Sequence, residues 1–426
     1  MPGTLLIHED LRLNSNLIDS IVIIGGGAAG FMAAITAAEI SPNSEIIILE
    51  KNRTVLNKVR ISGGGRCNVT HASFVNRLLI KNYPRGEQFL MKLLPHFDAQ
   101  ATVDWFAARG VALKTERDGR MFPVSNSSET IIDCLIREAT KKNVQIRTST
   151  SVKSFYADVN GKGFILNLGD DKQLITNRLL IASGGHPKRE GFDWLAAHQH
   201  DIQTPVPSLF SFNAPGNYLL PLSGVSVQDT KVQIMGTRLE WRGPLLITHW
   251  GFSGPSVLKL SAWGARVIAE RNYRFTCRIN WVPQHSESEI RDSLLQEKQK
   301  NPKQMVATHA RFGLPVRLWQ AFLEHVEIPA TLRWLDIPGK SVNQLVNLLI
   351  NSQFDINGKS TYKEEFVTAG GVALTEIDHS TLESKRVPGL YFAGEVLDVD
   401  GITGGFNFQN AWTTGYIAGR NIVLSS

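Results

Sequence analysis

Cysteine is scarce in this chain. Only three cysteines occur among 426 residues, namely Cys67, Cys134 and Cys277, and they lie far apart. This spacing provides no C-x-x-C redox pair, no disulfide framework and no cluster of metal ligands. The sequence therefore predicts that no metal is bound, and it favours a reducing compartment, which we take to be the cytoplasm.

Long apolar runs are also missing. Residues 1–19 contain early acidic residues and no apolar core, so they fit neither a signal peptide nor a membrane span, and we interpret them as an N-terminal lead-in. With 42% hydrophobic and 20% charged residues, the composition is that of a soluble globular protein without membrane contact. The length indicates two or three domains, and the sequence leaves the oligomeric state open.

Acidic residues are absent from one long stretch. No Asp or Glu occurs between Glu50 and Glu87, although that stretch contains eight Lys and Arg residues. Such a stretch supplies counter-charge to a bound anion. A nucleic-acid surface is the less favoured alternative, because the chain has no zinc pattern, no aromatic ribonucleoprotein motif and no recognition-helix signature.

Residues 21–50 contain the strongest motif that is present. The apolar run Ile21–Ile24 predicts a buried parallel strand. It is followed by GGGAAG, in which Gly25, Gly27 and Gly30 match G-x-G-x-x-G. In this motif the first glycine permits a tight turn, the second lets a pyrophosphate approach the backbone, and the third allows the helix to pack closely on the strand. The segment after the turn predicts a helix whose first residues, Ala28 and Ala29, face that anion.

The acid that completes this motif is Glu50. It follows a second apolar run, Ile46–Leu49, and stands 20 residues after Gly30, where a carboxylate accepts hydrogen bonds from ribose hydroxyls. Strand, glycine turn, helix, strand and acid occur in the required order. The sequence therefore predicts a dinucleotide-binding unit.

A second glycine-rich motif, ISGGGRCNVTH, lies within the acid-free stretch. Its three consecutive glycines suit neither a helix nor a strand, which indicates backbone close to a ligand, with a flexible surface loop as the alternative. A neighbouring Arg66 can lower the pKa of Cys67 and make it reactive. The preferred interpretation of Cys67 is a small residue packed near the cofactor.

The central part of the chain has two further features. Residues 88–143 show helical periodicity throughout, and the apolar run Leu179–Ile181 leads into Ser183-Gly184-Gly185, as expected for another strand end at the cofactor face. From about residue 204 prolines, turns and short alternating strands predict an insert, β-rich at 199–283 and helical at 284–352. Within THWGFSGP, His249 is a candidate proton carrier or substrate contact, with a buried structural histidine as the alternative.

The C-terminal part returns to strands that end in glycine turns. TAGGV is one, and GLYFAGE, which contains Gly394 and Glu395, is another. A glycine-rich turn then precedes a predicted helix at 408–423. Its N-terminus can stabilise negative charge on a reduced flavin ring.

Together, these motifs resemble the BaiN-type, YhiN-like NAD(P)/FAD-dependent oxidoreductases, a family that includes aminoacetone oxidase-like members. The resemblance spans residues 20–422 and depends on GGGAAG, ISGGGRCNVTH, THWGFSGP, TAGGV and GLYFAGEVLDVDGITGGFNFQNAWTTGYIAG. It implies an α/β, Rossmann-like FAD-binding domain of the two-dinucleotide-binding type, formed by 20–198 and 353–426. The insert at 199–352 would be β-barrel-like and then helical.

The resemblance also implies roles for individual residues. Gly25 to Gly30 would bind the pyrophosphate, Glu50 the adenosine ribose, Glu395 the ribityl chain, and Gly404 to Asn407 the pyrimidine end of the flavin. The remaining residues expected to contact FAD are Lys51, Lys58, Ser62, Gly63, Gly64, Gly65, Arg66, Cys67, Val152, Ser183, Gly184, Gly185, Gly394, Asp400, Gly405 and Phe406. The chain departs from the family pattern at Ile402, where proline is common, and at His71, where asparagine is common.

The expected function is that of an FAD-dependent oxidoreductase. Hydride from NAD(P)H or from a small organic substrate would pass through the flavin to an enone-like acceptor or to dioxygen. No separate nicotinamide fingerprint is present, so NAD(P)H would be a transient co-substrate or would not take part. Two alternatives remain open, an FAD-containing RNA-binding or RNA-modifying protein and a flavoprotein in which FAD is structural.

Overall fold

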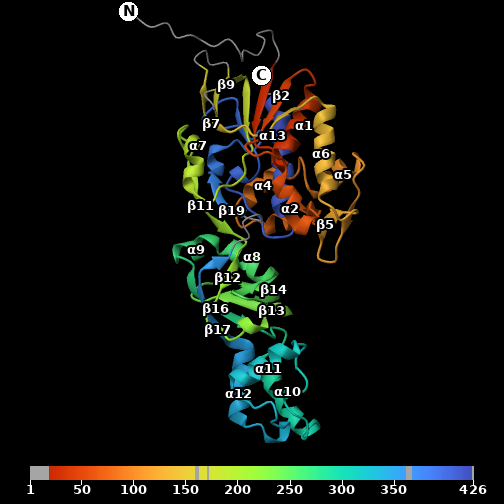
Figure 1. Cartoon of the computed structure of the whole chain (residues 1–426), viewed down its shortest axis with the longest axis vertical. Helices are drawn as coiled ribbons and strands as arrows, with labels where there is room; N and C mark the ends of the chain where they lie inside the picture. Colours follow the sequence, from red (N-terminus) through yellow and green to blue (C-terminus); the bar gives the residue numbers. More distant parts are fainter. Residues whose placement is uncertain (1–18, 159–162, 170–171, 361–366, 425–426) are drawn as a thin grey trace, which may run out of the picture. The chain divides into compact units, whose positions relative to one another are not determined.

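The computed structural model describes residues 19–158, 163–169, 172–360 and 367–424. The predicted lead-in, 1–19, therefore lies outside the described residues except for its last one. The chain divides into two compact units (Figure 1). The first unit ends at Val206 and resumes at Val367, and the second unit comprises the residues between them.

A five-stranded parallel sheet forms the centre of the first unit. Its order is β20-β10-β1-β2-β6, with every neighbouring pair parallel. The strands are β1 (Ser20–Ile24), β2 (Glu45–Leu49), β6 (Gln145–Arg147), β10 (Arg178–Ile181) and β20 (Leu390–Phe392). All of β1 is buried, as its unbroken apolar sequence predicts. Because the strands are parallel, their carboxyl ends meet at one edge, where this fold class binds ligands.

Two helices that are far apart in sequence pack together beside this sheet, α1 (Ala28–Ile40) and α13 (Phe406–Leu424). Their contact depends on glycine. A Cβ added at Gly415 would lie 2.5 Å from the carbonyl oxygen of Ala29, and one at Gly419 would lie 2.3 Å from that of Ala33. Since no side chain stands between the backbones, the N-terminal and C-terminal parts of the chain form one domain. Helix α6 (Glu129–Lys141) also contacts α1 (Figure 1).

Shorter elements surround these layers. The helices are α2 (Asn57–Gly65), α3 (Asn76–Leu79), η1 (Ile80–Asn82), α4 (Glu87–Leu93), α5 (Ala99–Ala107), η3 (Arg189–Phe192), α7 (Asp193–Ala196), η6 (Leu374–Glu376) and η7 (Gly394–Val396). The strands form the sheets β3-β5-β4 (Thr70–His71, Arg120–Pro123, Leu113–Thr115) and β7-β8-β9 (Val152–Ala157, Phe164–Leu168, Gln173–Thr176), and the pair β11-β19 (Ile202–Ser208, Val367–Val372).

The prediction of helix throughout 88–143 is wrong at its centre. Strands β4 and β5 form an antiparallel hairpin there, between α5 and α6. The turn of this hairpin contains Asp118-Gly119, with Gly119 at φ +84°, a conformation that glycine adopts without steric cost. Hydrogen bonding across the hairpin therefore replaces the helix that the apolar spacing alone suggested.

A seven-stranded antiparallel sheet forms the barrel of the second unit. Its order is β17-β16-β13-β14-β15-β12-β18. The strands are β12 (Ser211–Asn213), β13 (Ser226–Ile234), β14 (Glu240–Thr248), β15 (Gly251–Ser253), β16 (Arg274–Asn280), β17 (Ser352–Asn357) and β18 (Lys359–Ser360). Only Gly358, at φ +104°, separates β17 from β18, although they lie at opposite ends of the order. One bent segment thus pairs with both edges and closes the sheet, which confirms the β-barrel-like expectation.

This sheet extends past the residue at which the sequence ended the insert. Strand β17 begins at Ser352, alternates between buried and exposed side chains, and pairs with β16. Residues up to 360 therefore belong to the barrel, whereas the sequence interpretation assigned 353 onward to the cofactor domain.

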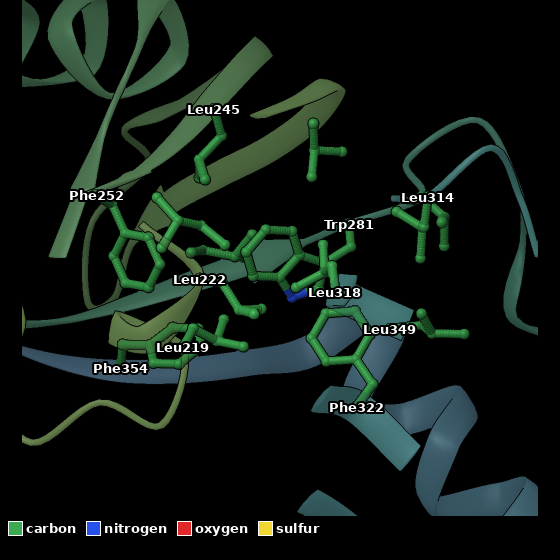
Figure 2. Close-up of a cluster of buried hydrophobic side chains, with 14 of the residues drawn as sticks. Leu219, Leu222, Leu245, Phe252, Trp281, Leu314, Leu318, Phe322, Leu349 and Phe354 are labelled. Carbon is green, nitrogen blue, oxygen red and sulfur yellow. The ribbon is translucent and has the colours of Figure 1, made fainter. Parts of the chain in front are cut away.

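One hydrophobic core unites the barrel with the helical part of the second unit. The helices are α8 (Pro255–Trp263), α9 (Ala265–Glu270), η4 (Leu220–Leu222), α10 (Glu287–Lys300), α11 (Val316–His325), η5 (Trp334–Asp336) and α12 (Gly339–Asn351). Figure 2 shows Trp281 between the barrel residues Phe252 and Leu245 on one side and Leu318 and Phe322 of α11 on the other. Its indole nitrogen donates to Ser352 Oγ at 3.0 Å, so the buried polar atom is satisfied.

Candidate cofactor site

The turn after β1 approaches the end of β10 very closely. Gly25 has φ +115°, and a Cβ there would lie 2.3 Å from the carbonyl oxygen of Ala182 and 3.0 Å from Cα of Ser183. Gly30 faces the same turn, since its added Cβ would lie 2.0 Å from the Gly25 carbonyl oxygen. Both positions therefore require glycine. The structure thus brings Ser183 beside the glycine motif, from more than a hundred residues along the chain.

The N-terminus of α1 is open to a ligand. Its first flanking residue, Gly27, provides no side-chain cap, and the first turn, which includes Ala28 and Ala29, has no acidic side chain. A Cβ at Gly27 would meet no atom within 4 Å. The N–H groups of this turn, together with the positive end of the helix dipole, form a site suited to an anion such as pyrophosphate.

Glu50 is held in place at the end of β2. Its Oε2 accepts a hydrogen bond from the Gly26 N–H at 3.0 Å, and its Oε1 accepts one from the Asn52 N–H at 2.8 Å. Gly26 was missed by the sequence reasoning, although it is the middle residue of the glycine run. Lys51, the next residue, is exposed. The Thr150 N–H donates to the Glu50 carbonyl oxygen at 2.9 Å, so the chain just before the half-buried Val152 also lies next to Glu50.

Three residues that the sequence analysis predicted separately as cofactor contacts, Lys58, Gly185 and Glu395, lie close together at the end of β20. Glu395 Oε2 pairs with Lys58 Nζ at 2.5 Å, and its Oε1 accepts from the Thr368 N–H at 2.9 Å. A Cβ at Gly185 would lie 2.8 Å from Glu395 Oε1 and 2.6 Å from Thr368 Oγ1. That Thr368 hydroxyl is buried and has no hydrogen-bond partner among the described residues. Gly394 next to this cluster would place a Cβ 2.9 Å from Cβ of Ala29 in α1.

The triple glycine forms a left-handed loop. The helical geometry of α2 breaks at Ser62, and Gly63, Gly64 and Gly65 have φ values of +59°, +68° and +81°. Added Cβ atoms at Gly64 and Gly65 would meet nothing within 4 Å, and the same holds for Gly184 after β10. These glycines leave open space beside the backbone, as expected of a segment that a ligand approaches.

The surroundings of Arg66 and Cys67 are not those of a reactive cysteine. Arg66 lies over the Phe122 ring at 4.1 Å and pairs with Glu116 at 2.7 Å. Cys67 is fully buried, and this burial raises the pKa of its thiol to about 12, although the Ser62 side chain acts in the opposite direction. The expectation that Arg66 lowers the pKa of Cys67 is therefore wrong, because desolvation dominates.

The glycine turn before α13 is fixed by its own side chains. Asn407 bonds both ways to Gly401, accepting from its N–H at 2.8 Å and donating to its carbonyl oxygen at 2.9 Å. Asp400 is fully buried in an ion pair with Arg85. These two residues support the turn itself, in addition to any role toward a cofactor.

The front of this turn packs on the segment around β3. Phe406 stacks on the His71 ring at 4.8 Å, and a Cβ at Gly405 would lie 2.6 Å from the Thr70 carbonyl oxygen. A Cβ at Gly404 would meet the Phe406 ring at 2.7 Å. Behind it lies a buried network that sequence reasoning missed: Gln409 accepts from the Thr70 hydroxyl at 2.6 Å.

These residues fit a long dinucleotide. Gly415 of α13 touches Ala29 in the first turn of α1, and Gly405 precedes Gly415 by ten residues. At 1.5 Å per residue, the N-terminus of α13 lies about 15 Å along the helix from that contact. The open N-terminus of α1 and the N-terminus of α13 at this separation suit a ligand that places a pyrophosphate at the first and a flavin ring at the second.

His249 lies in the second unit, on the turn between β14 and β15. It is exposed, and its ring meets Trp250 edge-on at 4.1 Å. The alternative of a buried structural histidine is therefore wrong, and a role in proton transfer stays a prediction.

Two expected absences concern metals and membranes. Among the described residues, no group of three or more His, Cys, Asp or Glu side chains is arranged to hold a metal ion. Within the same residues, no helix is both long and apolar enough to span a bilayer.

Comparison with known proteins identifies related chains over nearly the whole length. The family described as "HI0933-like protein Rossmann domain" matches residues 19–421. A 3-dehydro-bile acid delta(4,6)-reductase of Clostridium scindens is 28% identical over 413 residues, covering 95% of this chain and 98% of that protein. Ribosomal RNA dihydrouridine synthases of Haemophilus influenzae and Escherichia coli are each 29% identical, covering 94% and 95% of this chain and 98% of each relative.

A solved structure supports the fold. The 3-ketosteroid delta1-dehydrogenase of Sterolibacterium denitrificans, in complex with 1,4-androstadiene-3,17-dione, matches with a TM-score of 0.51 and 12% identity, over 96% of this chain and 100% of that chain. The Rossmann-like prediction is confirmed. The expectation that nucleic acid is an unlikely partner is not confirmed, because two relatives are named for ribosomal RNA.

Proposed function

Because this chain belongs to the HI0933-like Rossmann family of FAD-dependent oxidoreductases, we propose that it reduces a carbon–carbon double bond conjugated to a carbonyl group. The relatives' names carry this proposal. A delta(4,6)-reductase and a dihydrouridine synthase act on different molecules, yet a ring ketone with adjacent double bonds and a uracil both present an enone-like acceptor. Bound FAD would supply the hydride chemistry.

The residues of the first unit would position the cofactor. The N–H groups at Gly27 to Ala29 would bind its pyrophosphate, and Glu50, already held by Gly26, would accept hydrogen bonds from its ribose. The pair Lys58–Glu395 and the unpartnered Thr368 hydroxyl offer polar groups for the chain between ribose and ring.

The turn before α13 would stabilise negative charge on the reduced ring. Its backbone N–H groups precede a 19-residue helix, whose dipole favours an anion at this end. Asp400, Arg85 and Asn407 hold the turn rigid, so little reorganisation is needed when charge develops there.

The source of electrons remains part of the proposal. NADH, NADPH and a small organic donor are all compatible with the absence of a second dinucleotide motif in the sequence. We place the reaction in the cytoplasm, a proposal that the three free, buried cysteines support.

A second candidate acceptor is a uracil within RNA. The specific observation in its favour is the acid-free stretch between Glu50 and Glu87, which lies against the proposed flavin turn through His71, Tyr83 and Arg85. This candidate uses the same flavin chemistry and differs only in how the acceptor is recognised.

Anaerobic stopped-flow absorbance of the purified yellow protein tests the proposal. We would mix it separately with NADH, NADPH and a panel of small amines, and then mix the reduced protein with a cyclic enone or with a uridine-containing RNA. Bleaching by a donor and reoxidation by a conjugated acceptor without oxygen are expected. Reoxidation by dioxygen alone would instead indicate an oxidase, and a colourless protein that FAD cannot reconstitute would contradict the cofactor assignment.

A further inference from the structure

Residues 72–82 form a surface segment that is fixed to the turn before α13 at both ends. On one side, His71 stacks on Phe406 at 4.8 Å. On the other side, the Tyr83 hydroxyl donates to the Phe406 carbonyl oxygen at 2.7 Å, and the Ile402 N–H donates to the Asn82 carbonyl oxygen at 2.9 Å. The segment therefore borders the turn to which the proposed function assigns the flavin ring, and an acceptor that reaches the ring would pass near it.

The outer face of this segment exposes apolar side chains. Phe74 is 45% exposed, Val75 57% and Leu78 56%, so three of the large exposed apolar residues of the molecule fall within five positions. Leu79 and Ile80, on the inner face, are buried. A soluble protein rarely gathers such residues at one place without a binding role.

The same segment carries two unneutralised cations. Four of the eight basic residues between Glu50 and Glu87 pair with carboxylates, namely Lys58, Arg60, Arg66 and Arg85. Arg77 and Lys81, by contrast, are exposed and have no hydrogen-bond or ion-pair partner among the described residues. We call the side chains of Phe74, Val75, Arg77, Leu78 and Lys81 the outer strip.

The outer strip falls within eight consecutive positions, from Phe74 to Lys81. Helix α3 and the following turn η1 run from Asn76 to Asn82, so Arg77, Leu78 and Lys81 belong to these helical turns, whereas Phe74 and Val75 precede them. Cations and an exposed aromatic ring that are close together in the chain are a combination that can bind phosphates and an unstacked base.

We propose that the outer strip binds single-stranded RNA, with a base stacked on Phe74 and phosphates paired with Arg77 and Lys81. This inference rests on the proposed function, because it identifies the carrier of the conjugated acceptor. RNA is favoured over an apolar small molecule or a second copy of the chain, since neither of those accounts for two free cations in a stretch without a single acid. A single strand is required because a paired base has no free face for Phe74.

The test measures binding rather than turnover. The FAD-loaded protein would be titrated into fluorescein-labelled oligouridylate, and anisotropy would be followed at several potassium chloride concentrations. Stacking contributes roughly 1–3 kcal/mol per base, so Phe74→Ala should weaken binding roughly 5- to 150-fold, while Phe74→Tyr should retain it. The double variant Arg77→Ala, Lys81→Ala should reduce the slope of log K against log salt by about 1.4, at about 0.7 per phosphate contact.

Matched controls come from the second unit. Leu335 is 60% exposed, so Leu335→Ala removes an exposed apolar side chain, as Phe74→Ala does, and Lys340→Ala removes an exposed cation far from the outer strip in sequence. Both controls should bind RNA as the unchanged protein does. Flavin absorbance of each variant would verify that it is folded and loaded.

Several results would overturn the inference. They are absence of RNA binding at low salt, equal losses in the control variants, and outer-strip variants that bind RNA normally but alter the sedimenting mass, which would make the strip a contact between copies. Failure of the proposed function is separate: the reduced protein would then reduce neither a free enone nor RNA, whatever its affinity for oligouridylate.

Discussion

Gly30 illustrates how a single residue determines the cofactor turn. Its motif was readable because the constraint is local: Gly25, Gly27 and Gly30 act within six residues, and Glu50 follows on the next strand. The roles of Gly26 and Thr368 could not be predicted, because they depend on partners that are distant in sequence, Glu50 for Gly26 and Glu395 for Thr368. Spacing within one motif is visible in a sequence, whereas contacts between motifs require the fold.

Gly30→Ala and Gly27→Ala should differ in their effects on folding and on cofactor binding. The added methyl at Gly30 would overlap the Gly25 carbonyl oxygen at 2.0 Å, whereas at Gly27 it would meet nothing. We expect Gly30→Ala to lower the free energy of unfolding by about 1–3 kcal/mol or more, the range for overpacking. Gly27→Ala should change it little and yet weaken FAD binding, because the added methyl would intrude on the proposed pyrophosphate site.

Urea denaturation of the two apoproteins and FAD titration by fluorescence quenching would separate these effects. Equal stability of both variants would show that the turn relaxes more easily than its geometry suggests.

Cys67 should be inert in the native protein. Its folded pKa of about 12 lies above the unfolded value of about 8.5. The native thiol therefore keeps its proton, and stability present below about pH 8.5 is lost progressively as the pH rises toward 12.

We expect that a chromogenic disulfide reagent at pH 8 reacts with Cys67 only after denaturant is added, with Cys67→Ser identifying the signal. A rapid thiol phase that disappears in Cys67→Ser would contradict the burial described above.

At the scale of elements, continuous apolar runs were predictable, and the hairpin β4–β5 was not. The strand at β1 and the helix at α1 agree with the sequence because their apolar residues are continuous and buried. The hairpin β4–β5 was missed because its strands have only three and four residues, too few for a period to show. The Asp118-Gly119 pair was the available signal, since this dipeptide favours a hairpin turn.

The capping box of α10 offers a test at this scale. Ser286 accepts from the Glu289 N–H, and the Glu289 side chain accepts in return from the Ser286 N–H at 2.7 Å. Ser286→Ala should destabilise the protein by about 1 kcal/mol, the usual cost of a lost cap. Chemical denaturation would measure this, with Ser293→Ala inside the same helix as the control, where alanine should not destabilise. A cap variant as stable as the control would indicate that the packing of α10 alone fixes its start.

For the whole molecule, the insertion was predictable and its limits were less so. Composition changes near residue 204, and the two-unit division falls at 206/207 and 366/367, while the sequence interpretation used 199 and 352. Strand β11 crosses the limit at 206/207, and β17 begins at the limit that the sequence interpretation placed at 352. The unit to which a strand belongs is decided by its pairing partners rather than by its own sequence. The seven-stranded order could not be foreseen for the same reason.

Two units with separate cores should respond differently to cofactor. A ligand that binds only the folded first unit stabilises it by RT ln(1 + [L]/Kd), about 2.7 kcal/mol at a hundredfold excess over Kd. Scanning calorimetry of the apoprotein should therefore show two transitions, of which FAD raises one. Two transitions that rise together would mean that the second unit also depends on the cofactor, and a lone cooperative transition would mean that the units unfold together.

Gly358 has a consequence for how the protein behaves in a crowded solution. An open antiparallel sheet ends in strands whose unpaired N–H and C=O groups can recruit another chain and start aggregation. Here the residues on either side of Gly358 pair with both edges, so the barrel offers few such groups. A substitution that straightens this bend would leave both edge strands of the sheet unpaired at once. We expect such a variant to precipitate before it loses activity.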